Sequence, residues 1–187
     1  MRKIPLLYKT LIVFFVLSFS IYLAITTSSD SNLQIMVAKF GYLGIFLFSI
    51  VSGFNVLVPI PAVAFTPTFV ASGLNFWTII CIMTLGLTVG DLIGYFIGRV
   101  GKDVVKETGI HSKLFEKLFA IKNKFPRVPY FLVFLFASFV PFPNEILVIP
   151  LGFLGYHARY LLPAFFAGNI IFNIIYGYAG VALIELL

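Results

Sequence analysis

The chain of 187 residues is 60% hydrophobic and 11% charged, with a mean hydropathy of +1.06 and a net charge of +6. A soluble domain is about half apolar and about a quarter charged, so this composition excludes a soluble protein and indicates an integral membrane protein. The length allows one compact bundle of spans. No soluble module interleaves basic and aromatic residues, so we expect no nucleic-acid partner.

The N-terminal segment 1–32 has a basic start and an apolar run from Leu11 to Thr26. A membrane span needs about 17 to 25 such residues, so we predict an anchor whose N-terminus is cytoplasmic, followed by a short external loop. A basic flank before an apolar core also describes a secretory signal peptide. The length of the run, with no clear A-x-A site after it, favours a retained anchor.

Residues 33–100 form the first of two predicted repeats. Prolines and glycines interrupt an apolar sequence here too densely for one straight helix, and broken backbone at membrane depth must be buried in protein. We therefore predict a re-entrant hairpin between two membrane helices. In chain order, the elements are an apolar helix at 36–52, a hairpin at 54–73 with its Pro-x-Pro corner at Pro59 and Pro61, and a full span at 75–100.

Two residue series with four-residue spacing run along the predicted span at 75–100. This spacing keeps side chains on one helix face, so the glycines form a bare stripe against which another helix packs closely. The polar series beside it either pairs or snorkels next to a packing zipper, or faces a polar site inside the protein. The glycine stripe is Gly86, Gly90, Gly94 and Gly98, and the polar series is Asp91, Tyr95 and Arg99.

Residues 101–129 are the strongly charged segment of the chain, with seven lysines and arginines between Lys102 and Arg127. Apolar residues at helical spacing between Ile110 and Ile121 predict an amphipathic helix in the headgroup layer. The positive-inside rule places this connector in the cytoplasm together with the N-terminus. We therefore predict a multi-pass protein of the plasma (inner) membrane.

Residues 130–187 repeat the pattern of the first half. A Val-Pro-Phe-Pro sequence with Pro141 and Pro143 matches the corner at 58–61, and an apolar span at 160–183 follows. The first copy begins outside and the second begins inside, which is an inverted-topology repeat. In secondary transporters, matching interrupted segments mark a binding site near the midplane. The predicted fold is thus an all-α, polytopic inverted repeat with two opposed re-entrant hairpins, unless the two Pro-x-Pro motifs match by chance.

Several of these motifs together resemble the DedA family (SNARE-associated or VTT domain). They are the Gly-Tyr-x-x-Gly-Arg element ending at Arg99, the spaced hairpins, the basic connector and the Phe-Val-Pro start of the second hairpin. The resemblance covers roughly Phe40–Gly180 and implies that 33–187 is a VTT-like membrane domain. It also implies lipid transport, because bacterial members recycle undecaprenyl phosphate and eukaryotic relatives scramble phospholipids. Some bacterial members are thought to be coupled to protons.

The chain departs from the family pattern at both hairpins. Acids that often flank the first hairpin are missing, and the segment 138–144 lacks the two arginines that many members carry in the second. Glu145 follows that segment instead. In an apolar tip, this carboxyl suits a proton carrier or a partner of Arg99, or it caps a half-helix. Asn144 is likewise a good capping residue.

A lipid phosphate inside a bundle needs a cation or backbone N–H donors. Arg99 is the candidate for a bidentate contact, and Asn144, Glu145 and Tyr95 are the other substrate-binding candidates, although Tyr95 fits packing better. Ion coupling is assigned to Glu145 and Asp91. Asp91 is equally suited to a hydrogen bond with Asn169 or Asn173 across the repeat.

Catalytic and metal-binding patterns are missing from the sequence. His111 and His157 fall in loops without ligand partners at useful spacing, and no Ser–His pair or intramembrane Asp pair is present. We therefore predict no enzyme, metal or cofactor, and a lipid phosphate transporter whose partners are anionic or polyprenyl-phosphate lipids. The alternatives are a scramblase without ion coupling and a scaffold that holds a partner by its glycine stripe and basic helix. Whether copies form a homo-oligomer stays open.

Overall fold

The computed structural model describes residues 15, 18–19, 22, 25–26, 30–54, 61–107 and 127–186, with the backbone alone at 33, 36, 103–107 and 185. Within these ranges the chain forms helices and the turns between them, which confirms the predicted all-α class. Pro59, the connector helix predicted at 110–121 and most of the N-terminal anchor lie outside the described residues.

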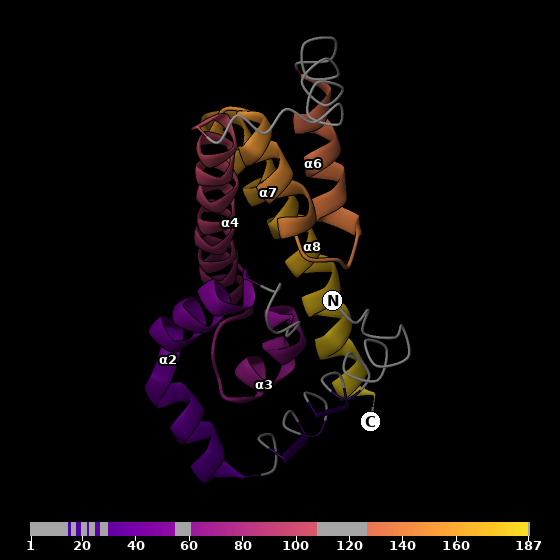
Figure 1. Ribbon diagram of the computed structural model, residues 1–187. Coiled ribbons are helices and arrows are strands. Elements are labelled where there is room, and N and C mark those ends of the chain that lie inside the picture. Colours follow the sequence, from indigo (N-terminus) through magenta and orange to yellow (C-terminus); the bar gives the residue numbers. More distant parts are fainter. Residues whose placement is uncertain are drawn as a thin grey trace.

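Seven helical elements follow one another along the described chain. Figure 1 shows α6 and α7 at one end of the molecule, α2 and α3 at the other, and α8 running between the two ends. The elements are α2 (Ser31–Ser52), the 3₁₀ turn η1 (Ala62–Phe65), α3 (Thr66–Ala71), α4 (Phe76–Glu107), α6 (Val128–Phe139), α7 (Glu145–Leu154) and α8 (Ala158–Glu185).

Two of the described helices are long and apolar enough to cross a membrane. They are Phe76–Lys102 of α4 and Ala158–Ile184 of α8, each 27 residues long, with mean hydropathies of 1.9 and 1.5. At about 1.5 Å per residue, each exceeds the roughly 30 Å of a bilayer's hydrocarbon core. Both coincide with the spans that the sequence predicts.

The shorter elements arise where the sequence interrupts a helix. Helix α2 bends at Gly41, whose φ of 52° suits a residue without a Cβ. After the break at Pro61, the Ala62 N–H donates to the Ser52 hydroxyl at 2.8 Å, which ties η1 to the end of α2. Helix α7 ends in a left-handed residue, Gly155, with φ of 75°. These breaks turn one apolar sequence into several short packed helices.

One short helix from each half packs on the long helix of the other half. Helix α7 lies against α4, and α3 lies against α8, while α2 packs on α4 and α6 on α8. The long helices also contact each other. The two halves are therefore interlocked around the α4–α8 contact rather than merely placed side by side.

The glycine stripe of α4 serves two different partners. A Cβ added to Gly86 or Gly90 would meet backbone atoms of α2 and of Gly53 that follows it, whereas one added to Gly94 or Gly98 would meet α7. Small residues permit such close helix contacts in membrane proteins. All four glycines of the stripe therefore pack against other segments of the same chain.

Two apolar clusters lie on either side of the α4–α8 contact. One is built on η1, the second half of α2 and the first part of α4, and the other on α4, α6, α7 and the start of α8. The first contains Ile45, Ala62, Val63, Ile79 and Met83, and the second contains Tyr95, Val133, Ala137, Val148, Leu154, Tyr156, Leu161 and Phe165.

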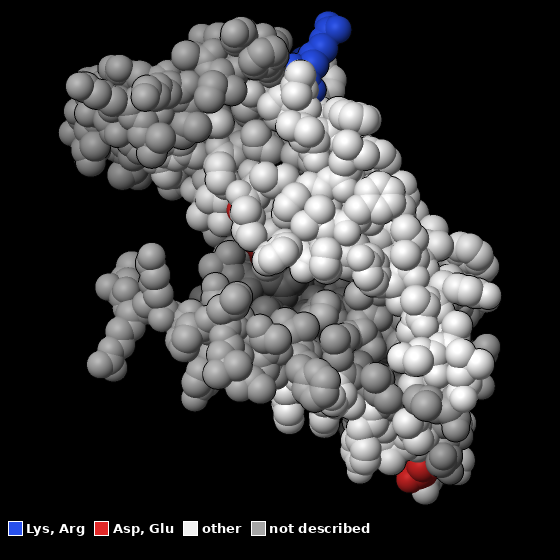
Figure 2. Space-filling view, turned by 90° about the vertical axis from the view of Figure 1, so that its right-hand side faces the viewer, with Lys and Arg blue, Asp and Glu red and all other residues white. Residues whose placement is uncertain are grey.

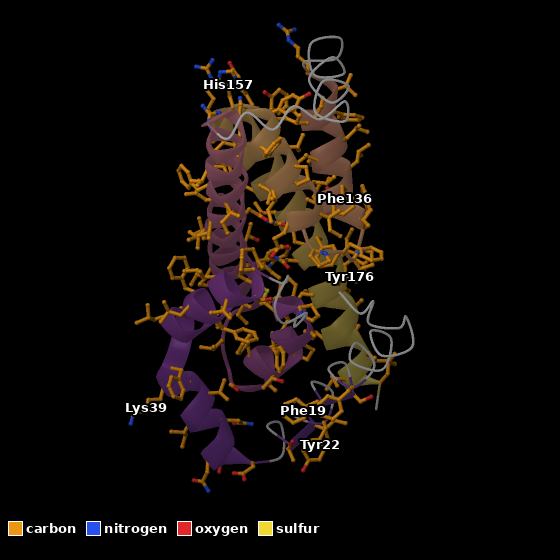
Figure 3. The ribbon with its side chains drawn as sticks, in the orientation of Figure 1. Phe19, Tyr22, Lys39, Phe136, His157 and Tyr176 are labelled. Atoms are coloured by element: carbon orange, nitrogen blue, oxygen red, sulfur yellow. The ribbon has the colours of Figure 1, made fainter. Side chains whose placement is uncertain are left out.

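The two ends of the described molecule differ in charge. Figure 3 places Lys39 near one end and His157 at the other, and Figure 2 shows lysine and arginine side chains gathered at one end. The sequence assigns most described cations to the turns around His157, at the end of α4 and the starts of α6 and α8. They are Arg99, Lys102, Arg127 and Arg159.

Candidate functional site

A buried polar cluster joins α4, α8 and the turn before α7. The Asn169 side-chain amide donates to Asp91 Oδ2 at 2.9 Å, and the Asn144 amide donates to the same oxygen at 3.3 Å. Asn144 Nδ2 also reaches Asn169 Oδ1 at 3.0 Å. Asp91 is 1% exposed, so its carboxyl is held almost wholly by amides from the second half of the chain. The hydrogen bond expected between Asp91 and Asn169 is confirmed.

Glu145 adds a second carboxyl to this cluster. It is the first residue of α7, is 2% exposed, and interacts electrostatically with Asp91. Gly94 makes room for it, because a Cβ at that position would lie 3.7 Å from Glu145 Cγ and 2.8 Å from Val148 Cγ1. The site therefore holds two buried carboxyl groups in mostly apolar surroundings.

Asn144 plays a different part from the helix cap that the sequence favours. It immediately precedes α7, but its side chain makes no capping hydrogen bond. The amide is instead committed to Asp91 and Asn169, while its backbone carbonyl accepts from the Leu147 and Val148 N–H groups. Asn144 therefore occupies the N-cap position, but the predicted side-chain capping bond is not formed, because its amide is bonded to Asp91 and Asn169.

The cluster lies at matching positions along the two long apolar helices. Asp91 precedes Lys102 by eleven residues, and Asn169 follows Ala158 by eleven. At the helical rise, both are about 16 Å from the basic end of the molecule. A membrane that covers these helices would therefore place Asp91 and Asn169 near its midplane.

A second polar contact joins the same helices farther from the basic end, one turn along α8 and about two turns along α4. Asn173 is fully buried, and its amide donates to Thr84 Oγ1 at 3.1 Å. Four- and seven-residue spacings place Thr84 and Asp91 on one face of α4, opposite Asn169 and Asn173 on α8. Thr84 is a site residue that sequence reasoning missed, although its seven-residue distance from Asp91 carries the signal.

Tyr95 and Arg99 continue the polar series of α4 toward the basic end. The Tyr95 hydroxyl donates to the buried Tyr156 carbonyl at 2.9 Å, which confirms the packing role with a satisfied hydroxyl. Arg99 is exposed. It lies eight residues beyond Asp91, which corresponds to about 12 Å along the helix and about 80° around it. The structure thus brings Asp91, Asn144 and Glu145 together but not Arg99.

The hairpin prolines lie at the edges of the short helices. Pro61 is half-buried directly before η1, whereas Pro141 is exposed and Pro143 half-buried in the turn between α6 and α7. These prolines interrupt the helical backbone just before the short helices begin, and none of them has a backbone N–H to donate.

No group of three or more histidine, cysteine or acidic side chains suited to a metal ion occurs in the described part of the chain. The candidate site is therefore a set of two carboxyls and two amides. Such groups can hold a proton or orient a polar ligand.

Comparison with known proteins agrees with these features. The family profile of the VTT domain matches residues 58–182, which is well over half of the chain. No curated protein and no solved structure gives a significant match. VTT domain proteins are generally membrane proteins, and the two apolar helices agree with membrane association. The resemblance to the DedA family is confirmed, and the chain belongs to the VTT domain family.

Proposed function

We propose that this chain is a multi-pass membrane transporter that moves a lipid phosphate between leaflets, with protons exchanged at Asp91 and Glu145. The observation that carries the proposal is the pair of buried carboxyls at mid-depth, held between helices of both halves. Substrates of this class are undecaprenyl phosphate and anionic phospholipids. The activity is transport rather than catalysis.

Two buried carboxyls in a spanning bundle are costly, and such groups mark ion or proton pathways in membrane proteins. Asp91 and Glu145 interact electrostatically, and two neighbouring carboxyls in an apolar site readily share one proton. Asn144 and Asn169 supply amides that can bond either protonation state by rotating their O and N atoms. The cluster is therefore suited to take up and release a proton without unfolding.

The proposed architecture is an inverted repeat in which η1–α3 and α7 belong to opposed re-entrant hairpins. Its support is the exchange of short helices between the halves, with α7 on α4 and α3 on α8. Inverted repeats with broken helices place a transporter's site at the repeat interface, which corresponds here to the α4–α8 contact. The proposed location is the plasma membrane, with the basic end in the cytoplasm.

Arg99 receives the lipid phosphate at the basic end in this proposal. Its exposed guanidinium offers a bidentate donor, and the neighbouring cations Lys102, Arg127 and Arg159 raise the local concentration of anionic headgroups. Because Arg99 is about 12 Å along the helix from Asp91, headgroup capture and proton exchange occupy separate places. Membrane lipids are thus the proposed partners.

The scaffold alternative relies on the glycine stripe and the basic helix as partner-binding surfaces, and the structure argues against the first of these. It requires a free glycine stripe, whereas Gly86 and Gly90 meet α2 and Gly53, and Gly94 and Gly98 meet α7. A scramblase without ion coupling has no use for paired carboxyls in the interior. Transport coupled to protons uses both the carboxyl pair and the basic end.

The test is leaflet exchange of fluorescent undecaprenyl phosphate and phospholipids in proteoliposomes, with and without a pH gradient. Arg99→Gln should slow exchange at low lipid concentration, whereas Lys39→Gln, which removes an exposed charge near the opposite end, should not. Glu145→Gln and Asp91→Asn should abolish the response to the gradient, and Asp30→Asn at the opposite end should retain it. Exchange of many lipids that ignores the gradient would identify a scramblase, and no exchange by folded protein would overturn transport.

A further inference from the structure

Three buried side-chain oxygens between α8 and the η1–α3 turn have no hydrogen-bond partner among the described residues. They are Thr66 Oγ1, Thr68 Oγ1 and Asn173 Oδ1. Thr66 and Asn173 are fully buried, and Thr68 is 5% exposed. Buried polar groups are normally satisfied by protein or by ordered water. None of the three oxygens takes part in a hydrogen bond described above. They can therefore still bind a polar ligand or water that the proposed site does not include.

Three elements meet beside Thr66. A Cβ added to Gly177 would lie 3.3 Å from Thr66 Cγ2, 3.4 Å from Thr66 Oγ1 and 3.2 Å from Ile80 Cδ1. Gly177 therefore leaves bare backbone where η1–α3, α4 and α8 meet. Asn173 and Thr84 bond each other one helical turn away, on the same faces of α8 and α4.

Asn173 lies on α8 between Asn169 of the carboxyl site and Gly177 beside Thr66. Asn169, Asn173 and Gly177 follow at four-residue steps along α8, about 6 Å apart, and Thr84, Thr88 and Asp91 face them from α4. The Thr88 hydroxyl donates to the Thr84 carbonyl at 2.8 Å. We name these residues, together with Thr66 and Thr68, the polar seam. It runs from the Asp91–Glu145 site toward the end formed by α2 and α3.

We propose that the polar seam binds internal water and carries protons between the carboxyl pair and the compartment beyond α3. This inference rests on the proposed proton-coupled function and gives it a direction, since the route leads away from the basic end. Hydroxyl and amide oxygens accept and donate to water, and a bound water needs two to four such partners. A chain of waters and hydroxyls is a path along which protons move.

Water fits the part of the polar seam around Thr66 and Asn173 better than a metal cation does, because no charged side chain of the described residues lies in that part. The ionisable side chains buried in the described chain are Asp91, Glu145, Tyr95 and Tyr156. Both tyrosines lie toward the basic end, where the Tyr95 hydroxyl bonds the Tyr156 carbonyl. Helices α8 and α3 contribute only amides and hydroxyls to the seam. A desolvated cation would lack a carboxylate at Thr66 and Asn173.

The test removes single oxygens and leaves the carboxyl pair intact. Thr66→Val and Thr68→Val keep the side-chain shape. Ser49→Ala is the matched control, because it deletes an equally buried hydroxyl that bonds its own helix at Ile45. Each variant enters proteoliposomes for lipid exchange with and without a pH gradient, and for proton uptake with an entrapped pH dye. A structure in lipid at a resolution that shows water reports on the seam directly.

We expect ordered water on Thr66 Oγ1 and Asn173 Oδ1, and a loss of about tenfold in gradient-stimulated exchange and proton uptake in the threonine variants. Exchange without a gradient should stay near the parent's rate, as should every rate of the Ser49→Ala variant. A parent that responds to the gradient and threonine variants that respond equally would overturn the seam alone. A parent that exchanges no lipid would overturn the proposed function instead. Acceleration by a sodium gradient in place of a pH gradient would replace water by a cation and overturn the inference.

Discussion

A close backbone contact between α4 and the turn that follows α2 gives a sharp stability prediction. A methyl group at Gly90 would lie 2.7 Å from the Gly53 carbonyl carbon and 2.8 Å from its Cα and oxygen. Ordinary contact begins at 3.4 Å, so Gly90→Ala must push the end of α2 away by about 0.7 Å, since backbone atoms cannot rotate aside. Overpacking of this kind costs about 1–3 kcal/mol.

Gly101→Ala provides the matched control for this substitution. Its methyl would meet only Phe153 Cδ2, at 3.8 Å. Both changes gain the same helix propensity, about 1 kcal/mol, so the difference between the two variants isolates the steric cost. We expect Gly90→Ala to be less stable than Gly101→Ala by about 1–3 kcal/mol.

The assay is equilibrium unfolding in mixed micelles with increasing SDS. Trp77 is the single tryptophan of the chain and lies in the first turn of α4, so its fluorescence follows the helix that carries both substitutions. Circular dichroism provides an independent measure of helix content. Equal stability of the two variants, within about 0.5 kcal/mol, would refute the close contact between Gly53 and Gly90.

Two further predictions concern the basic end and the orientation of the chain. Tyr95→Phe leaves the buried Tyr156 carbonyl without its donor and should lower the free energy of unfolding by about 1–3 kcal/mol; an unchanged value in the same SDS titration would contradict the hydrogen bond. In a Cys81→Ala background, Lys39→Cys and Arg159→Cys should react with an impermeant maleimide from opposite sides of sealed vesicles. Labelling of both from one side would exclude the proposed topology.

The long spans could be predicted because their signals are strong and local. An apolar run of more than twenty residues is sufficient for α4 and α8, and the four-residue repeat of glycines indicates close packing whatever the partner is. The partner itself could not be predicted. Gly90 meets the turn at Gly53 and Gly94 meets α7, and that division depends on how two distant segments dock. The bend at Gly41 likewise has no sequence signal beyond the glycine itself.

The sequence identified the acidic residues of the site, but it did not predict which residues the fold brings together around them. Asp91 and Glu145 stand out as acids in apolar surroundings, and Asn169 was one of two expected partners for Asp91. Arg99 follows Asp91 at four-residue steps, but each step drifts by about 40°, so the second step carries its side chain out of the buried face. Asn144 was expected to cap a helix because such residues usually do, and only the folded chain reveals the carboxylate that competes for its amide.

The exchange of short helices between the halves has a consequence for how the protein is made. When α4 leaves the translocon, the residues that bond Asp91 have not yet been synthesised, because they follow it by 53 and 78 positions. An aspartate at the centre of an inserting helix costs about 2.5–3.5 kcal/mol, which the apolar remainder of α4 must offset alone. Insertion of the first half therefore relies on hydropathy, and its polar residues are satisfied only when the second half arrives. A nascent chain that stalls between α4 and α7 would expose an unsatisfied acid to lipid.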